Sequence, residues 1–256
     1  MDHCLFSRRA VLGGALFGVG AMGFRPVLAM AQGSEREHQP KLHLPILAED
    51  PAAVPVVVWV DHPMGPDHFI TSIEVTLETD PVSRKGVFLF TPANGRARVA
   101  FQMRSGLGGL VKATVECSRY GRFVGTGEVR VAADGCTSLP DKVAKDRIGN
   151  PMLRVPRSFK VGEVIEVRTK IDHPSDTGLN FRDGKFVLER PEFFLKQMRV
   201  SFDGQLISDF RLTSAVSPNP LIRFPLKVTR AGTLGVAFAN NEGQQWVTTQ
   251  FIRPAG

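Results

Sequence analysis

Short segments in which hydrophobic and polar residues alternate run through most of the chain. VPVVVWV (residues 54–60), VKATVEC (111–117) and QWVTTQFI (245–252) combine this period of two with many β-branched residues. Gly, Pro, Asn or Asp separates such segments roughly every 8 to 12 residues, and no window after residue 31 has a sustained helical period. Short strands at this spacing predict an all-β fold built from antiparallel sandwiches.

The same criteria predict strands in both halves of the chain. In the first half the expected strands cover residues 54–60, 69–77, 86–90, 96–104, 111–117 and 127–131. In the second half they cover residues 163–171, 196–207, 207–213, 222–228, 233–240 and 245–252. Asp203-Gly204 is typical of a tight hairpin turn, and segments 119–121 and 241–243 are expected to form equivalent turns in the two halves.

The two halves also resemble each other. Asp-His-Pro stands at residues 61–63 and again at 172–174, and GGLVKATVECSRYGRF (108–123) aligns with AGTLGVAFANNEGQQW (231–246). Each copy has roughly 100 residues, enough for its own core. We therefore predict two immunoglobulin-like sandwich domains, over residues 32–133 and 151–256, joined by a linker over residues 134–150.

Residues 1–31 have the features of an export signal. Arg8 and Arg9 precede a Gly-rich apolar run, and an Ala-Met-Ala cleavage site ends at Ala31. Paired arginines before a mild apolar run indicate the twin-arginine route and a periplasmic protein. The run is too short and too glycine-rich for a stable membrane span, so no membrane association is expected after cleavage. The alternatives are an ordinary secretory signal and an uncleaved anchor.

Charge and motifs exclude several classes of function. The formal net charge is +7, but the basic residues are not clustered and do not alternate with aromatic residues, so no nucleic-acid partner is expected. The chain has no phosphate-binding loop, no haem-attachment motif and no nucleophile elbow. We therefore expect no cofactor, and a carrier or adaptor protein rather than an enzyme.

His62 and His173 each precede a proline at the end of a predicted strand. A residue before proline favours an extended or turn conformation, and the preceding Asp side chain can cap such a turn. A metal ligand or a catalytic base is the alternative role. No second His or Cys stands at ligand spacing, and the feature occurs in both copies. We therefore interpret both histidines as structural corners and predict no metal site.

Cys136 lies in AADGCTS (residues 132–138), between the two predicted domains. This segment supplies little apolar area, so its thiol is expected to be exposed. Gly135 gives the adjoining chain conformational freedom. Cys4 leaves with the signal, and Cys117 is expected at the end of a hairpin strand, partly exposed. A Cys117–Cys136 disulfide would require the two Cα atoms to lie within roughly 7 Å.

Both halves resemble known families. RVPRSFKVGEVIEVRTKIDHPSDTGL (154–179) and SAVSPNPLIRFPLKVTRAGTLGVAFANNEGQQW (214–246) closely resemble SoxZ. LPILAEDPAAVPVVVWVDHPM (44–64) through GEVRVAADGC (127–136) resembles SoxY at lower similarity. The resemblance implies paired immunoglobulin-like domains and a role in thiosulfate oxidation. In SoxY the chain ends in GGCGG, whose cysteine covalently carries sulfur intermediates, and Cys136 aligns with that cysteine.

Two departures from the family bear on this role. The motif here is DGCTS (134–138), with one glycine instead of four, and it is internal because the SoxZ-like half follows it. This arrangement resembles the fused SoxYZ-like carriers found beside quinoprotein dehydrogenase genes. Thr137 is β-branched and stiffer than glycine, so Cys136 is expected at the apex of a tethered loop.

Three roles for Cys136 remain open at this point. The resemblance implies a covalent sulfur carrier that serves Sox-type c-type cytochromes and a hydrolase. The second is an incidental cysteine in an adaptor that binds a quinoprotein dehydrogenase or its cytochrome. The third is a disulfide with Cys117.

Overall fold

The computed structural model describes residues 36–132 and 148–255, and the fold within them is all-β, as the alternating pattern predicts. The strands of the first half are β1 (Lys41–His43), β2 (Leu47–Ala48), β3 (Val54–Val60), β4 (Ile70–Leu77), β5 (Arg84–Phe90), β6 (Ala97–Met103), β7 (Gly109–Cys117) and β8 (Gly121–Val131). Those of the second half are β9 (Gly149–Arg154), β10 (Val164–Asp172), β11 (Leu179–Arg182), β12 (Lys185–Leu188), β13 (Leu195–Phe202), β14 (Gln205–Leu212), β15 (Leu221–Lys227), β16 (Gly232–Asn240) and β17 (Gln245–Ile252). A short 3-10 helix, η1 (Pro92–Asn94), links β5 to β6. None of the helices among these residues is long and apolar enough to cross a membrane.

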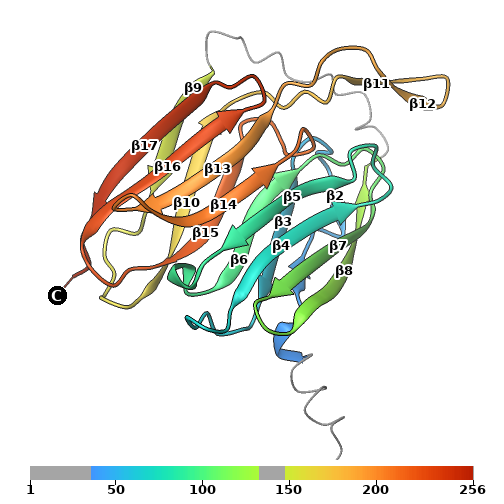
Figure 1. Cartoon of the computed structure of the whole chain (residues 1–256). Helices are drawn as coiled ribbons and strands as arrows, with labels where there is room; N and C mark the ends of the chain where they lie inside the picture. The colour runs from blue at the N-terminus through green and yellow to red at the C-terminus, as the bar shows by residue number, and fades with distance from the viewer. Residues whose placement is uncertain (1–35, 133–147, 256) are drawn as a thin grey trace, which may run out of the picture.

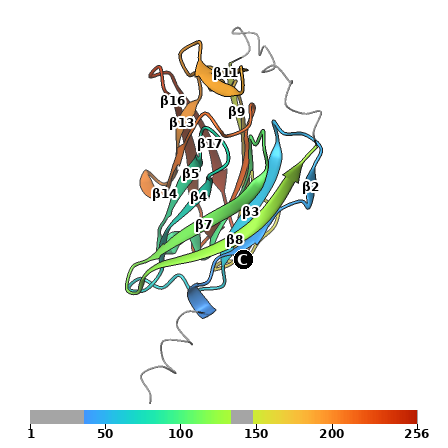
Figure 2. The same ribbon diagram turned by 90° about the vertical axis from the view of Figure 1, so that its right-hand side faces the viewer.

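Two large sheets run through both halves of the molecule (Figures 1 and 2). One has nine strands in the order β17-β16-β13-β14-β5-β4-β7-β8-β2, and the other has six in the order β1-β3-β6-β15-β10-β9. If each strand is exchanged for its counterpart in the other half (β4 for β13, β5 for β14, β7 for β16), the central order reads the same from either end. The topology therefore confirms the internal repeat and relates the halves by an approximate twofold axis.

Strand pairing between the halves makes each sheet continuous. β5 pairs antiparallel with β14 from Gly86 opposite Leu212 to Phe90 opposite Ser208, and β6 meets β15 at Ala100. The inward faces of both sheets form one hydrophobic core, because side chains alternate across each strand. The rings of Phe88 and Phe210, one from each half, meet edge to face at 5.2 Å between centroids. The expected pairing of the two halves within one chain is thus present.

The predicted turns and most predicted strands match the structure. Asp203 and Gly204 both have positive φ (48° and 80°) and join β13 to β14, as a tight hairpin requires. The pattern missed β1, β2, β9, β11 and β12. β1, β2 and β9 are short edge strands, and β11 and β12 form an exposed hairpin that projects from the body, so none has a clear buried face (Figure 1). β9 begins at Gly149, so the last two residues of the expected linker belong to a strand.

Asn94 joins the halves through a fully buried side chain. Its Nδ2 donates to Ser208 Oγ and to the Pro225 carbonyl, each at 2.9 Å, and both acceptors belong to the second half. Its Oδ1 accepts from Thr91 N at 2.9 Å, which also fixes the start of η1. A buried amide with all these bonds formed fixes one geometry between the halves, because any shift would leave a polar group without a partner and away from water.

Lys85 is a second buried polar side chain, 1% exposed. Its Nζ donates to Asp80 Oδ2 at 2.7 Å, to the Val82 carbonyl at 3.1 Å and to the Arg104 carbonyl at 3.0 Å. These three acceptors match the three donors of an ammonium group. Burial lowers the pKa of Lys85, whereas the Asp80 carboxylate raises it. The group ties β5 to the β4–β5 turn and to the end of β6.

Replacing Asn94 with alanine should lower the free energy of unfolding by about 1 to 3 kcal/mol, because Ser208 and Pro225 lose a buried partner. Urea unfolding at neutral pH measures this loss. Asn241→Ala is the control, since Asn241 is exposed and bonds only within the second half. Equal losses for the two variants would contradict a joining role for Asn94.

Replacing Lys85 with methionine should cost about 3 to 5 kcal/mol, because the Asp80 carboxylate is left buried without its partner. Lys112→Met removes an exposed ion pair with Glu78 and should change stability little. Thermal and urea unfolding of both variants provide the comparison. A loss at Lys85 no larger than that at Lys112 would argue against this reading.

Candidate functional site

The cysteine expected to carry cargo, Cys136, lies outside the described residues together with Gly135. Its covalent role and its disulfide with Cys117 therefore stay predictions. The structure places the two ends of the segment that contains it. Ala132 N donates to the Ala48 carbonyl at 3.0 Å just after β8, and the described chain resumes at Ile148, before β9. β8 lies near one edge of the nine-stranded sheet, and β9 forms an edge of the six-stranded sheet.

Cys117 is the last residue of β7 and is only 5% exposed. Its place at a hairpin end is as predicted, but the expectation of partial exposure is wrong. Val111, Ala113 and Val115 point into the core along β7, and the period of two carries Cys117 to the same face. The thiol is therefore an inward-facing group at the end of the sandwich.

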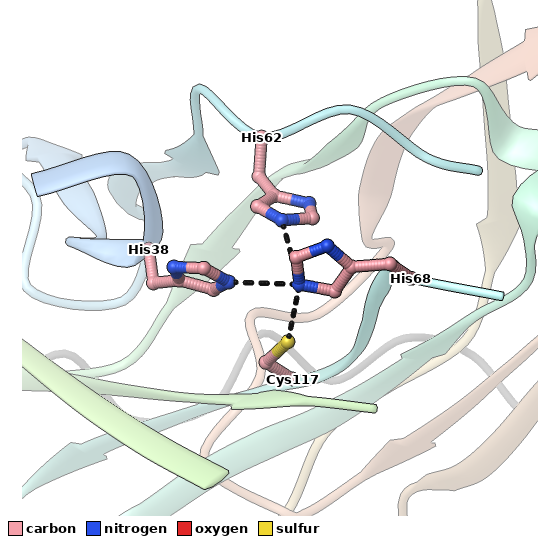
Figure 3. A group of neighbouring side chains, drawn as sticks. All are labelled: His38, His62, His68 and Cys117. Carbon is pink, nitrogen blue, oxygen red and sulfur yellow. Dashed lines mark hydrogen bonds between the residues drawn. The ribbon is translucent and has the colours of Figure 1, made fainter. Parts of the chain in front are cut away.

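Three histidines surround this thiol (Figure 3). His68 Nε2 lies 3.2 Å from Cys117 Sγ. The same nitrogen lies 3.2 Å from His38 Nε2 and 3.2 Å from His62 Nε2. All four donor atoms are within 4.8 Å of one another, and every residue of the group except His68 is buried. We call His38, His62, His68 and Cys117 the histidine–cysteine cluster.

The loop between β3 and β4 supplies two members of the cluster. His62 continues the inward alternation of Val58 and Val60 past the end of β3, so its ring points into the sandwich. Gly65 N donates to the His68 carbonyl at 3.0 Å, which closes the loop and returns His68 toward His62. His68 then stands just before the start of β4, which pairs with β7.

His38 comes from the N-terminal segment, which packs beside β8 (Figure 2). Gln39 Nε2 donates to the Val124 carbonyl at 2.7 Å. The Pro40 carbonyl passes so close to Gly125 that a Cβ there would lie 2.3 Å from its oxygen. Only glycine allows this approach, so β8 is shaped to receive the segment that carries His38.

Aromatic rings cover the cluster on its outer side. Phe123 stacks on His38 with centroids 4.7 Å apart, and Tyr120 meets the rings of His38 and His68 at 5.3 and 5.1 Å. Tyr120 is 57% exposed. The cluster is therefore just beneath the surface, at the β7–β8 hairpin end.

The surroundings of His62 and His68 favour the neutral forms of these two rings. Burial lowers the pKa of His62, and the neighbouring His38 and His68 lower it further. Burial is also the largest cause that lowers the pKa of His68, and the neighbouring His38 and Arg119 lower it further. His62 Nδ1 is buried and forms no hydrogen bond of regular geometry, although the nearby Pro63 carbonyl raises the pKa of this ring. Neutral rings keep a lone pair, so nitrogen and sulfur donor atoms converge on one point.

The equivalent corner of the second half has different chemistry. By strand register, His173, Phe193 and Asn240 occupy the places of His62, His68 and Cys117. His173 Nδ1 bonds to the Pro174 carbonyl, and its Nε2 lies 3.4 Å from Asn240 Nδ2. Its ring packs against Phe193 with centroids 4.8 Å apart. His173 is therefore a structural corner, as predicted.

For His62 the argument from sequence spacing was wrong. Its neighbours in the cluster are His68, six residues further along the same loop, and His38 and Cys117, which are distant in the chain, so local spacing could not reveal the whole group. The expectation of no metal-ligand cluster does not describe this corner. A signal did exist in the repeat. His68 and Cys117 stand where the other copy has Phe193 and Asn240, and both replacements introduce atoms that bind metals.

Two families of sulfur-oxidation proteins match the chain. Sulfur oxidation protein SoxY matches residues 28–136, and sulphur oxidation protein SoxZ matches residues 153–250. Comparison with the curated proteins gave no match.

Two solved structures illustrate the likeness found among known structures. Superoxide reductase (neelaredoxin) from Ignicoccus hospitalis is 15% identical with a TM-score of 0.32, covering 48% of this chain and 92% of that one. A glycosyl hydrolase family 2 member from Bacteroides cellulosilyticus is 12% identical with a TM-score of 0.24, covering 82% of this chain and 28% of that one. At such low TM-scores neither likeness carries an argument.

The structural role of His173 predicts a pH effect on stability. Burial lowers the pKa of His173 from its ordinary 6.5, although the Pro174 carbonyl and Glu242 act in the opposite direction. Below about pH 6.5 the unfolded state binds this proton more readily, so stability falls as the pH falls. His173→Gln should lose less stability than the parent protein between about pH 7.5 and about pH 5.5. Urea unfolding at both pH values measures the difference.

The matched control is His43→Gln, which removes an exposed imidazole by the same substitution. A His173→Gln variant as sensitive to acid as the parent protein would contradict this prediction, because it would show that the ring binds its proton as readily in the folded state as in the unfolded state.

Proposed function

The chain belongs to the SoxY family in its first half and to the SoxZ family in its second, and on this premise we propose that it is a covalent sulfur carrier with its cargo on Cys136. The two families support a carrier role in sulfur oxidation rather than an enzymatic one. The observation that carries the choice of residue is the extent of the first match, which ends at residue 136.

Burial argues against Cys117 as the carrier cysteine. Cys117 is 5% exposed and faces imidazole rings, so its sulfur cannot enter the active sites of several partner enzymes. A carrier thiol needs that access, together with a bond that holds cargo reversibly. This leaves Cys136, in a segment of small and polar residues, as the carrier.

Sulfur–sulfur bonding supplies the reversible attachment. A thiolate that exchanges with an oxidised sulfur compound forms a new S–S bond and releases another thiolate, with no net oxidation. Joining the thiolate to a reduced anion such as thiosulfate removes two electrons, which a redox partner must accept. We expect c-type cytochromes in that role and a hydrolase to release the product. The adaptor alternative would instead have the chain bind a quinoprotein dehydrogenase or its cytochrome without sulfur chemistry.

The segment between Ala132 and Ile148, which we call the carrier segment, is attached to the fold at both ends. β8 ends at Val131 and β9 begins at Gly149, and both strands are held in sheets. A cysteine in such a segment cannot extend as a terminal arm does. The partner enzymes are therefore proposed to receive Cys136 in an open cleft rather than in a deep tunnel.

Residues 1–31 support a periplasmic location, reached through the twin-arginine route and followed by removal of the segment. A carrier there could meet exported cytochromes and remain in an oxidising compartment.

Replacing Cys136 with serine should abolish sulfur loading without unfolding the protein. Native mass spectrometry of the exported protein, purified from cells that oxidise thiosulfate, should find sulfur adducts on Cys136 that a reductant removes. The Cys136→Ser variant should carry none and should lose sulfur-dependent activity. Thr137→Ala, beside the thiol, should keep both properties.

Two results would contradict the carrier role. The first is full activity in Cys136→Ser, which would favour the adaptor alternative. The second is a resting protein two hydrogens lighter, with Cys117 and Cys136 in one cross-linked peptide.

A further inference from the structure

We propose that the histidine–cysteine cluster binds one divalent first-row transition-metal ion through three imidazole nitrogens and one thiolate. The four ligands are His38, His62, His68 and Cys117. The proposal does not rest on the carrier role of Cys136, because no residue of the cluster belongs to the carrier segment.

The spacing of the donor atoms is that of a metal coordination shell. A tetrahedral site with metal–nitrogen bonds of about 2.05 Å and a metal–sulfur bond of about 2.3 Å places its ligand atoms about 3.3 to 3.6 Å apart. The three distances from His68 Nε2 to the other donor atoms are each 3.2 Å. The remaining pairs lie within 4.8 Å. Closing these remaining pairs by at most about 1.5 Å would complete the shell.

Hydrogen bonding cannot account for the contacts at His68. An imidazole nitrogen offers either one N–H or one lone pair. His68 Nε2 therefore forms at most one regular hydrogen bond, yet His38, His62 and Cys117 all approach it to 3.2 Å. The other two approaches to this nitrogen therefore need an explanation other than a hydrogen bond to it. A cation at the centre would turn all of them into neighbouring ligands of one ion.

The ligand types restrict the ion. Mg²⁺ and Ca²⁺ prefer oxygen ligands, and the cluster offers none. Imidazole together with thiolate suits zinc, iron and copper. Four protein ligands from three segments, largely buried, favour a closed and structural site of the kind that Zn²⁺ occupies.

The second half serves as an internal comparison for this assignment. It keeps the histidine of the Asp-His-Pro corner but has Phe193 and Asn240 in place of His68 and Cys117. At that corner Phe193 supplies a ring contact and Asn240 supplies an amide, where the first half has the proposed metal ligands. Since the fold needs no metal-binding residues at this corner, their presence in the first half calls for a separate reason.

The bound ion would tie the N-terminal segment to the sandwich. His38 is the only ligand outside the β3–β7 region, and it follows closely on the expected cleavage site after Ala31. The cluster is located where β8 begins, whereas the carrier segment leaves from its other end. These ends are about 33 Å apart along an eleven-residue strand. The ion would therefore fix the N-terminal segment of the exported protein to the end of the sandwich.

Co²⁺ is the probe for a test on the full exported protein, freed of metal with a chelator. One equivalent should bind and produce the absorption bands of a tetrahedral, thiolate-ligated ion, and Zn²⁺ should displace it. Metal analysis of the protein as purified should find about one equivalent of zinc, iron or copper, and the element found identifies the native ion.

Variants assign the ligands. Cys117→Ser should remove the thiolate-to-cobalt band, and His62→Ala should weaken Co²⁺ binding by more than about 100-fold, the upper range for loss of an outer-shell partner. Cys136→Ser and His43→Ala should bind as the parent protein does. Circular dichroism checks that each variant is folded.

A measurement on the parent protein needs no variant. Co²⁺ or Zn²⁺ should protect Cys117, but not Cys136, from alkylation, as resolved by peptide mass spectrometry. Substoichiometric binding, a cobalt spectrum without thiolate bands, or alkylation of Cys117 at the same rate with and without metal would overturn the proposal.

Discussion

Antiparallel pairing of β5 with β14 is the interaction on which the rest of this structure depends. It joins a four-stranded array of the second half to a five-stranded array of the first half, while the contact of β6 with β15 joins the opposite layer. Because side chains alternate across every strand, continuous sheets enclose one continuous core. The buried Asn94 then fixes the relative position of the halves by bonding across the junction. The two domains are structurally one body, although the chain encodes them as two copies.

This joining determines where chemistry is available. The centre of the molecule is filled by the shared core, and the chemistry proposed for this chain lies at an outer corner and in the segment between β8 and β9. The two cysteines illustrate the division. Cys117 faces inward among imidazole rings at a corner, whereas Cys136 belongs to the connecting segment. A thiol among imidazole rings and a thiol proposed to reach partner enzymes have opposite requirements for exposure, and they belong to different parts of the chain.

The approximate twofold symmetry gives one backbone corner two different uses. His62 and His173 occupy equivalent places, each before a proline at the end of a strand. In the second half the ring is held by Asn240 and Phe193, as a buried polar group requires. In the first half histidine and cysteine replace those neighbours, and a third histidine arrives from the N-terminal segment. A duplicated fold can thus keep a structural corner in one copy and acquire a binding site in the other.

The sequence by itself determined the all-β class, the repeat and the main hairpin turns. These features depend on local alternation and on residues such as Asp203 and Gly204, whose conformations are set within a few positions. It also singled out Cys136 through composition and family resemblance. Only the tertiary structure decided that the sheets are continuous and that positions 38, 62, 68 and 117 meet. Pairing between distant strands leaves no local pattern, and residues on three separate segments become neighbours only when packing closes the sandwich.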